Sequence, residues 1–279
     1  VTQTSPAVTF AAGTPVEFNG DADTGNLAMA YDSSNNKIVL AYTNYYFTPT
    51  SAGACIIGTV SGTTTSWGTP VVFTSGASRD FGMAFDSTNN KVVIAFRDDA
   101  DANKGKAIVG TVSGTSISFG TAVEFESGNT QEMNCAFGNG QVLIMYVDTG
   151  DTNTTKAIVG TVSGTSISFG TQVSSGWTYS NNPTAAYDST ADKFYFAFRD
   201  NLAGNYGSSA VITVTGTTPA FGSAVTFISV DILAGGDPKL GVTYDPVADK
   251  TVVAYYNGSL NKGYAVVATI AGTTPSYGT

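Results

Sequence analysis

An internal repeat dominates this sequence. The segment KAIVGTVSGTSISFGT occupies residues 106–121 and returns without change at residues 156–171. A shorter tag, an aromatic residue followed by Gly and then Thr or Ser, marks further copies about fifty residues apart. The tag glycines are Gly68, Gly120, Gly170, Gly222 and Gly278, and a weaker copy of the tag contains Gly13. Because duplicated units of this length stack as equivalent modules, residues 1–279 are predicted to form one domain.

Each unit carries the sequence signals of four short β-strands. β-branched and aromatic residues flank a turn in segments 27–44, 82–98, 135–148, 185–200 and 241–257, a pattern that indicates hairpins. AIVGTV and SISFGTAVEF supply the third and fourth strands, and no segment has a helical period. The sequence therefore predicts an all-β fold, a five-bladed β-propeller of four-stranded antiparallel blades. A stacked β-solenoid is the alternative, but its repeats would be shorter.

The two ends of the sequence suggest how the ring closes. Residues 7–18, AVTFAAGTPVEF, have the pattern of a fourth strand without the three that should precede it. The last unit, in contrast, reaches only the start of its own fourth strand. We therefore expect the N-terminal strand to complete the last blade, so that no sheet edge stays open. The missing initiator Met and the stop within a repeat suggest a processed chain or a fragment.

Composition excludes several classes of function. The formal net charge is −9, which repels a phosphate backbone, so nucleic acid is not an expected partner. No apolar run approaches the roughly 18 residues that span a bilayer, so membrane insertion is not expected. The chain has no histidine, which removes Ser-His-Asp and Cys-His catalysis and His-ligated metal sites. Cys55 and Cys135 fall at different positions of different units, which favours two buried thiols over a disulfide.

The loops of the units divide into a uniform set and a variable set. The turns between strands one and two and between strands three and four stay alike, whereas the loops between strands two and three and between units differ. In an up-and-down sheet, the variable loops share one end of the blades. A binding face is the favoured interpretation, because loops on a rigid scaffold often carry recognition. Drift remains an alternative, since tight-turn geometry alone can keep the other face uniform.

One position on the variable face carries the same type of residue in every unit. Strand two ends in an Asp or Asn in every unit, namely Asn44, Asp98, Asp148, Asp200 and Asn257. The favoured interpretation is an Asx turn that caps the strand end. The alternative is a ring of acceptors for sugar hydroxyls. Two units place a guanidinium just before this position, at Arg97 and Arg199, and such a group suits carboxylate or hydroxyl ligands.

Other residues of the variable loops complete the candidate binding surface. Aromatic side chains suit the apolar face of a sugar ring, and they are dense in the loops of the first and fourth units. The further candidates are Tyr45, Tyr46, Arg79, Asp80, Trp177, Tyr179 and Tyr206. No cofactor is expected. Asp99, Asp101 and Asn103 resemble the start of a calcium loop, but the glycine comes late and no bidentate Glu follows, so a solvated acidic loop is the favoured interpretation.

Catalysis is not predicted. The remaining route is carboxylate chemistry, which needs paired acids from different blades at the mouth of the channel. Asp80, Glu132 and Asp237 occupy suitable loops, but nothing in the sequence singles them out.

FDSTNNKVVIAFRD followed by KAIVGTVSGTSISFGT resembles the tandem repeats of virion and tail-fibre proteins of marine bacteriophages and of some bacterial surface proteins. The architecture is similar to five-bladed lectins. The resemblance implies an adhesin on the extracellular or virion surface, part of a larger fibre, with a cell-surface glycan or host receptor as partner. We therefore predict a non-enzymatic recognition propeller. The alternatives are a structural spacer and, less favoured, a glycan depolymerase.

Overall fold

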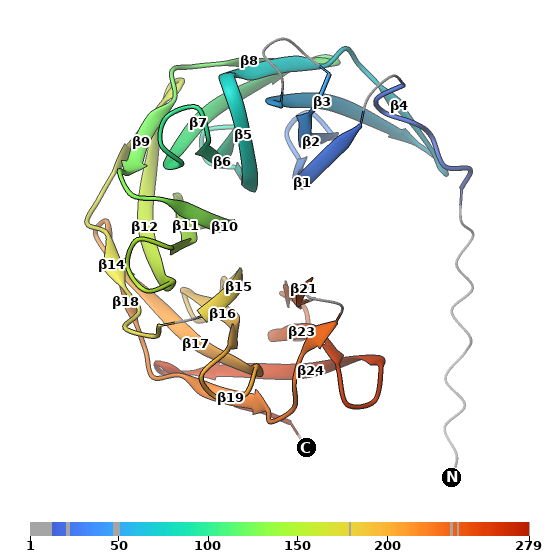
Figure 1. Ribbon diagram of the computed structural model, residues 1–279. Helices are drawn as coiled ribbons and strands as arrows, with labels where there is room; N and C mark the ends of the chain where they lie inside the picture. The colour runs from blue at the N-terminus through green and yellow to red at the C-terminus, as the bar shows by residue number, and fades with distance from the viewer. Residues whose placement is uncertain are drawn as a thin grey trace.

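The computed structural model describes residues 13–20, 23–46, 51–178, 180–234, 237–238 and 240–278, and within these ranges it contains strands and no helix. Five four-stranded antiparallel units follow one another along the chain. Figure 1 shows them arranged as an arc around a central space, as in a β-propeller, with the arc open between the first and last units. The all-β propeller prediction is confirmed, and the number of blades in a complete ring stays a prediction.

The strands of each unit run in the order one, two, three, four. Unit 1 comprises β1 (Thr24–Asp32), β2 (Lys37–Asn44), β3 (Ala52–Ser61) and β4 (Thr64–Trp67). Unit 2 comprises the second half of β5 (Val71–Asp86), β6 (Lys91–Asp98), β7 (Lys104–Ser113) and β8 (Ser116–Phe119). Unit 3 comprises β10 (Thr130–Gly138), β11 (Gln141–Asp148), β12 (Thr154–Ser163) and β13 (Ser166–Phe169). All five predicted hairpins are confirmed.

Units 4 and 5 repeat this plan. Unit 4 comprises β15 (Ser180–Asp188), β16 (Lys193–Asp200), β17 (Tyr206–Thr215) and β18 (Thr218–Phe221). Unit 5 comprises β22 (Leu240–Asp245), β23 (Lys250–Asn257), β24 (Lys262–Ala271) and β25 (Thr274–Tyr277). The connecting segments add β9 (Val123–Glu126), β14 (Val173–Ser174), β19 (Val225–Ile228) and the small pair β20 (Leu233–Ala234) and β21 (Asp237–Pro238). β25 corresponds to β4, β8, β13 and β18, the strands that precede the tag glycine in the other units, so unit 5 contains the start of its fourth strand, as expected.

The predicted continuous fourth strand is broken at the tag glycine. β8 pairs with the C-terminal half of β7, and β9 pairs with the N-terminal half of the same strand. Between them, Gly120 lies against the next unit, where an added Cβ would stand 1.9 Å from the Thr165 carbonyl oxygen. Only glycine permits this approach. The tag glycine is therefore repeated because it packs against the next unit. The residue pattern along the strand did not predict this contact.

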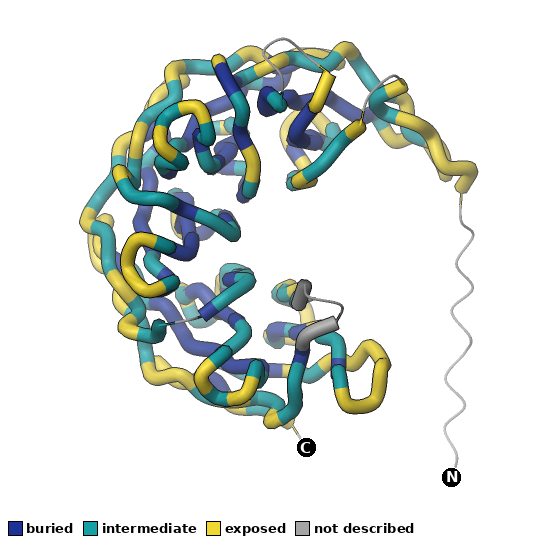
Figure 2. Tube along the Cα trace, in the orientation of Figure 1, coloured by how far each residue is buried: buried dark blue, intermediate teal, exposed yellow. Residues whose placement is uncertain are grey.

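The apolar cores lie between neighbouring units. One cluster joins Val93 and Ala95 of unit 2 to Ile144 and Tyr146 of unit 3, and equivalent clusters join the other consecutive pairs. Figure 2 shows buried segments within the arc and exposed segments at its ends and loops. Each unit thus covers the apolar face of the next.

The uniform loops owe their constancy to turn chemistry. Asp86 Oδ1 accepts hydrogen bonds of 2.9 Å from the backbone N–H groups of Thr88 and Asn89. Asp188 Oδ1 accepts equivalent bonds of 3.0 and 2.9 Å from Thr190 and Ala191. Left-handed residues follow in these turns, where Asn, Asp and Gly are tolerated best. Turn geometry alone therefore explains why this face does not vary.

The predicted closing strand at residues 7–18 is only partly visible. Residues 7–12 lie outside the described residues. Residues 13–18 carry no strand, and Phe18 packs against Tyr42 and Trp67 of unit 1, with ring centroids 5.3 and 5.8 Å apart. The described part of this segment therefore lies on unit 1 and does not pair with unit 5.

Candidate active site

The first strand of each of units 1 to 4 has a bulge at the same place. The pairing register shifts there in all four hairpins, and each bulge contains a non-glycine residue in the left-handed region. These residues are Asn26, Asp80, Glu132 and Asn182, with φ of 49°, 55°, 53° and 53°. Left-handed backbone is unfavourable for side chains other than Asn, Asp and Gly, most clearly for Glu132. Left-handed residues at one position of four units mark a candidate site.

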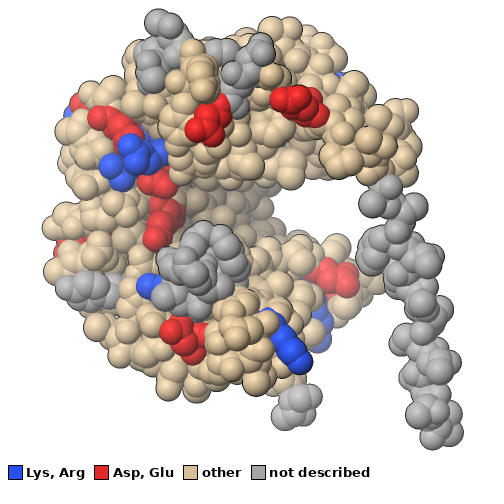
Figure 3. Space-filling model, turned by 45° about the vertical axis from the view of Figure 1, so that its right-hand side comes forward, with Lys and Arg blue, Asp and Glu red and all other residues tan. Residues whose placement is uncertain are grey.

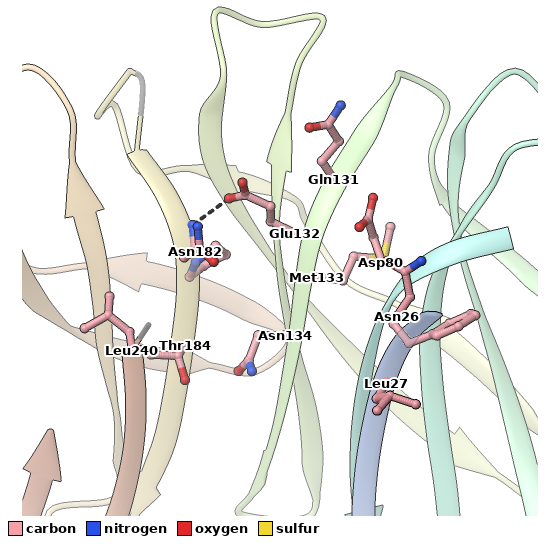
Figure 4. A pocket seen from close by; sticks show the side chains of 12 residues that line it. Asn26, Leu27, Asp80, Gln131, Glu132, Met133, Asn134, Asn182, Thr184 and Leu240 are labelled. Carbon is pink, nitrogen blue, oxygen red and sulfur yellow. Dashed lines mark hydrogen bonds between the residues drawn. The ribbon is translucent and has the colours of Figure 1, made fainter. Parts of the chain in front are cut away.

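All four bulge residues line one central pocket of about 540 Å³. Neighbouring residues of the same strands complete the wall, and Leu240 adds a contribution from unit 5. Figure 4 shows Asp80, Glu132 and Asn182 around this space, and Figure 3 shows acidic side chains along the inner side of the arc. The bulges lie where strand one pairs with the end of strand two, so the pocket belongs to the variable-loop end of the channel.

Asp80 is a carboxyl group with a perturbed acidity. Burial is the largest cause that raises the pKa of Asp80 above its ordinary value of 3.8. The guanidinium groups of Arg97 and Arg79 oppose this rise, whereas the carboxylates of Glu132 and Asp99 add to it. Arg97 Nη1 stands 3.8 Å from Asp80 Oδ2. A buried carboxyl beside a second carboxylate is a typical proton donor.

Glu132 is held in place by the next unit. Its Oε1 accepts a hydrogen bond of 3.1 Å from Asn181 Nδ2, and its Oε2 accepts one of 2.5 Å from the backbone N–H of Asn182 (Figure 4). Asn134 of the same strand accepts a hydrogen bond of 3.1 Å from the backbone N–H of Ala185. These contacts fix the Glu132 side chain at the edge of the pocket.

The loop that resembled a calcium site is filled by cationic side chains. Asp99 pairs with Arg79 and Arg97, with N–O distances of 2.5 and 2.7 Å, and Arg97 Nη2 donates a hydrogen bond of 2.8 Å to Asn103. Asp101 forms ion pairs with Lys104 and Lys106. Among the described residues, no group of three or more His, Cys, Asp or Glu is placed to hold a metal ion.

The Asp and Asn residues that end strand two form Asx turns. Asn44, Asp98, Asp148 and Asp200 each accept a hydrogen bond from the backbone N–H two residues later, at 2.8 to 3.1 Å. Asn257 Oδ1 accepts one from the Leu260 N–H at 3.1 Å. Their oxygens are therefore engaged in capping. A role for this ring in binding sugar hydroxyls stays a prediction.

The predicted aromatic residues are placed differently from one another. Trp177 stacks on Phe198 with ring centroids 5.1 Å apart, so one of its faces is covered. Tyr46 is 70% exposed, and Tyr45 packs beside Gly25, which precedes the pocket residue Asn26. Tyr206 is half-buried, and Tyr179 lies outside the described residues. Arg199 donates a hydrogen bond to Asn201.

The predicted binding residues thus include Asp80, Arg79 and Arg97, which the structure brings together. Glu132 was named only as a candidate acid, and Asn26 and Asn182 were not predicted. One signal was available, because each precedes its hairpin turn by the same distance as Asp80 does. The side chain of Asp237, the third candidate acid, lies outside the described residues.

Among the described residues there is no helix that could cross a membrane.

The comparisons with known proteins support the fold. No family model matches this chain, and no curated protein matches it. A protein of unknown function from Dyadobacter fermentans superimposes with a TM-score of 0.56 at 13% identity, covering 95% of this chain and 85% of that one. An exo-beta-1,3-galactanase from Phanerochaete chrysosporium, solved with beta-1,3-galactotriose, gives a TM-score of 0.51 at 7% identity, covering 96% of this chain and 68% of that one.

A second exo-beta-1,3-galactanase, from Clostridium thermocellum, matches over 91% of this chain with a TM-score of 0.48 and 11% identity, and this chain spans 64% of its length. At these identities the likeness shows a β-propeller fold and nothing finer. The comparisons give no support to the tail-fibre resemblance.

The prediction of a non-enzymatic adhesin is contradicted. A glycoside hydrolase stands among the structures with this fold, and carboxyl groups of neighbouring units line one pocket. The sequence obscured this arrangement because Asp80 and Glu132 are separated by a whole unit along the chain. Their convergence depends on the backbone bulges and on the stacking of the units.

Proposed function

We propose that this protein is a glycan-active enzyme, a glycoside hydrolase whose reaction takes place in the central pocket. One observation carries the proposal. Asp80 and Glu132 occupy the same strained position in neighbouring units and line the same pocket. Glycoside hydrolysis uses such a pair of carboxyl groups, one as a proton donor and one as a carboxylate that acts as base or nucleophile.

The environments of the two groups suggest their roles. The raised pKa of Asp80 suits the donor that protonates the leaving glycosidic oxygen. Glu132, fixed by hydrogen bonds to both of its oxygens, suits the carboxylate that activates water or attacks the sugar. The galactanase that shares the fold was solved with a galactotriose, which supports a carbohydrate as the ligand. Because polysaccharides do not cross membranes, we place this activity outside the cell.

The amide side chains of the pocket favour sugar hydroxyls as ligands. Asn26, Gln131 and Asn182 line the space together with the apolar Met133 and Leu240. Amides can both donate and accept hydrogen bonds, and apolar groups suit the flat face of a sugar ring. Tyr45 lies next to this wall, so the predicted aromatic candidates of unit 1 extend the proposed surface.

The direct test measures release of reducing ends from a panel of neutral polysaccharides, including a β-1,3-galactan. The variants are Asp80→Asn and Glu132→Gln, which preserve size. Each is expected to lower kcat by a factor of about 100 or more, because each removes a reacting group.

Asp249→Asn serves as the matched control. Asp249 lies in the turn between strands one and two of unit 5, where its carboxylate accepts a hydrogen bond from Tyr244, and asparagine tolerates its φ of 54°. Its activity should equal that of the unmodified protein. Equal activity of all four proteins, or no product from any glycan, would refute the proposal.

A further inference from the structure

The interior faces of the units have a fixed apolar design. On the face of unit 2 that meets unit 3, Val93, Ala95, Ala107 and Val109 are fully buried. On the opposite face of unit 2, Phe81 and Met83 are only 7% and 8% exposed, because they pack in the cluster shared with unit 1. Every interior unit is therefore covered on both sides.

The face of unit 5 that borders the opening carries equivalent apolar residues, but no described unit packs on it. The positions that correspond to the buried set of unit 2 carry Val252, Ala254, Ala265 and Val267. Ala254 and Ala265 are exposed, and Val267 is 45% exposed. Small and β-branched apolar side chains on an open sheet face are typical of an interface.

Unit 1 presents the complementary face on the other side of the opening. Leu27 and Met29, the counterparts of Phe81 and Met83, are 60% and 64% exposed, and Tyr31 is 53% exposed. Figure 2 shows exposed segments of the first and last units on either side of this opening. The two uncovered faces are the two halves of the inter-unit junction seen elsewhere in the arc.

Residues 13–18 indicate what lies between these faces. Between units 1 and 2, Gly68 lies against Thr115, and Phe73 packs on Phe96 and Phe119 with ring centroids 5.6 and 5.4 Å apart.

On unit 1, Gly13 lies against Thr63, and Phe18 packs on Tyr42 and Trp67 in the same manner. Residues 13–18 therefore occupy the place of the segment that leaves a preceding unit. If unit 5 docked on unit 1, its own Gly278 would have to take the place that Gly13 holds.

We propose that the open side of the arc is a docking site for one further repeat unit of this same pattern. Its occupant buries Leu27 and Met29 on one side and Val267 on the other, as each interior unit buries its neighbours. Because residues 13–18 take the place of the segment after a fourth strand, and the sequence predicts that strand just before them, the occupant supplies the first three strands. The interface continues the four junctions already present.

The test adds a separate three-stranded probe to the full chain. The probe is a polypeptide with the sequence of residues 130–163, which form β10, β11 and β12. Binding is measured by titration calorimetry and by the rise in Tm with probe concentration, which follows from ligand linkage. The expected result is saturable binding of one probe per chain.

Two matched controls address the two sides of the interface. In the probe, Leu143 and Ile144 belong to clusters on opposite faces, so a Leu143→Glu, Ile144→Glu probe should not bind. In the chain, Met29→Glu with Val267→Glu should abolish binding and preserve the β-sheet circular dichroism spectrum, because both side chains are exposed.

Three outcomes would overturn the proposal. One is the absence of binding when circular dichroism shows that both the chain and the probe have β-sheet structure. Another is an intrachain disulfide that forms readily in a Met29→Cys, Val267→Cys variant, since it would show that unit 5 closes on unit 1. The third is a stable dimer by sedimentation that the paired glutamate substitutions dissociate, since a second copy would then cover these faces.

Discussion

Glu132 Oε2 accepts a hydrogen bond of 2.5 Å from the backbone N–H of Asn182, the residue at the equivalent bulge of the next unit. The two left-handed bulges are thereby linked, because Asn182 lies where the pairing of β15 with β16 is interrupted and donates its N–H to Glu132. Repetition of one local backbone irregularity thus builds a ring of polar groups in the centre of the arc. The backbone of the bulge at Asn182 therefore holds the side chain of the bulge residue in the preceding unit, Glu132.

Asn182 should tolerate glycine and reject a β-branched residue. Asn182→Gly keeps the backbone N–H and suits the φ of 53°, so the free energy of unfolding should change by less than about 0.5 kcal/mol. Asn182→Val forces a β-branched side chain into the left-handed region and should destabilise by about 1 to 3 kcal/mol. Urea denaturation of both variants measures the difference. Equal stability of the two would show that the bulge is not maintained in solution.

The pKa of Asp80 should respond in opposite directions to its two kinds of neighbour. Glu132→Gln removes a charge that raises the pKa of Asp80, so the value should fall. Arg97→Gln removes the charge that most lowers it, so the value should rise. Carbon-13 NMR of the Asp80 carboxyl follows both shifts directly. A shift of the same sign in both variants would contradict the geometry of the pocket.

The raised pKa of Asp80 also affects stability. The folded protein holds the Asp80 proton to higher pH than the unfolded chain does, so the contribution of Asp80 to stability falls as pH rises from 3.8 through its folded value. Asp80→Asn should remove this part of the decline. Unfolding free energies at several pH values from 3 to about 8 test the sign. A steeper loss of stability in Asp80→Asn would refute it.

Gly120 should be far less replaceable than Gly278, although both stand in the same tag. A Cβ at Gly120 would lie 1.9 Å from the Thr165 carbonyl oxygen, whereas a Cβ at Gly278 meets nothing within 4 Å. Gly120→Ala should therefore destabilise by about 1 to 3 kcal/mol or more, and Gly278→Ala should have little effect. Thermal unfolding of the pair checks this, and equal Tm values would disprove the inter-unit contact.

The two thiols should be inert in the folded protein. Burial raises the pKa of both Cys55 and Cys135 to about 12, so almost no thiolate is present at pH 8, and both side chains are enclosed. Ellman's reagent should label neither residue in the native state and both in guanidinium chloride. Fast labelling without denaturant would contradict their placement in the inter-unit cores.

The sequence predicted the parts of the fold that depend on local pattern. The hairpins, the Asx turns at Asp98 and Asp148, and the buried free thiols all follow from residue type and spacing, because turn chemistry acts over a few residues. The break in the fourth strand at Gly120 was not predicted, since it depends on the carbonyl of a residue in the next unit.

The candidate site shows the same division. Arg79, Asp80 and Arg97 were named from their loops, but the convergence of Asp80 with Glu132 was not predicted. The bulges that turn these side chains toward the centre are backbone irregularities without a strong sequence signature. The expectation of a non-enzymatic surface failed for this reason, because nothing in the sequence singled out Asp80 and Glu132 among the acids considered for the mouth of the channel.

The sequence alone determined that equivalent four-stranded units would form, because each unit repeats its apolar alternation and its turn residues. Only the tertiary structure decided which side chains meet, which faces are covered and where the arc stays open. Those outcomes depend on packing between residues about fifty positions apart, and single-residue preferences do not encode the relative placement of separate sheets.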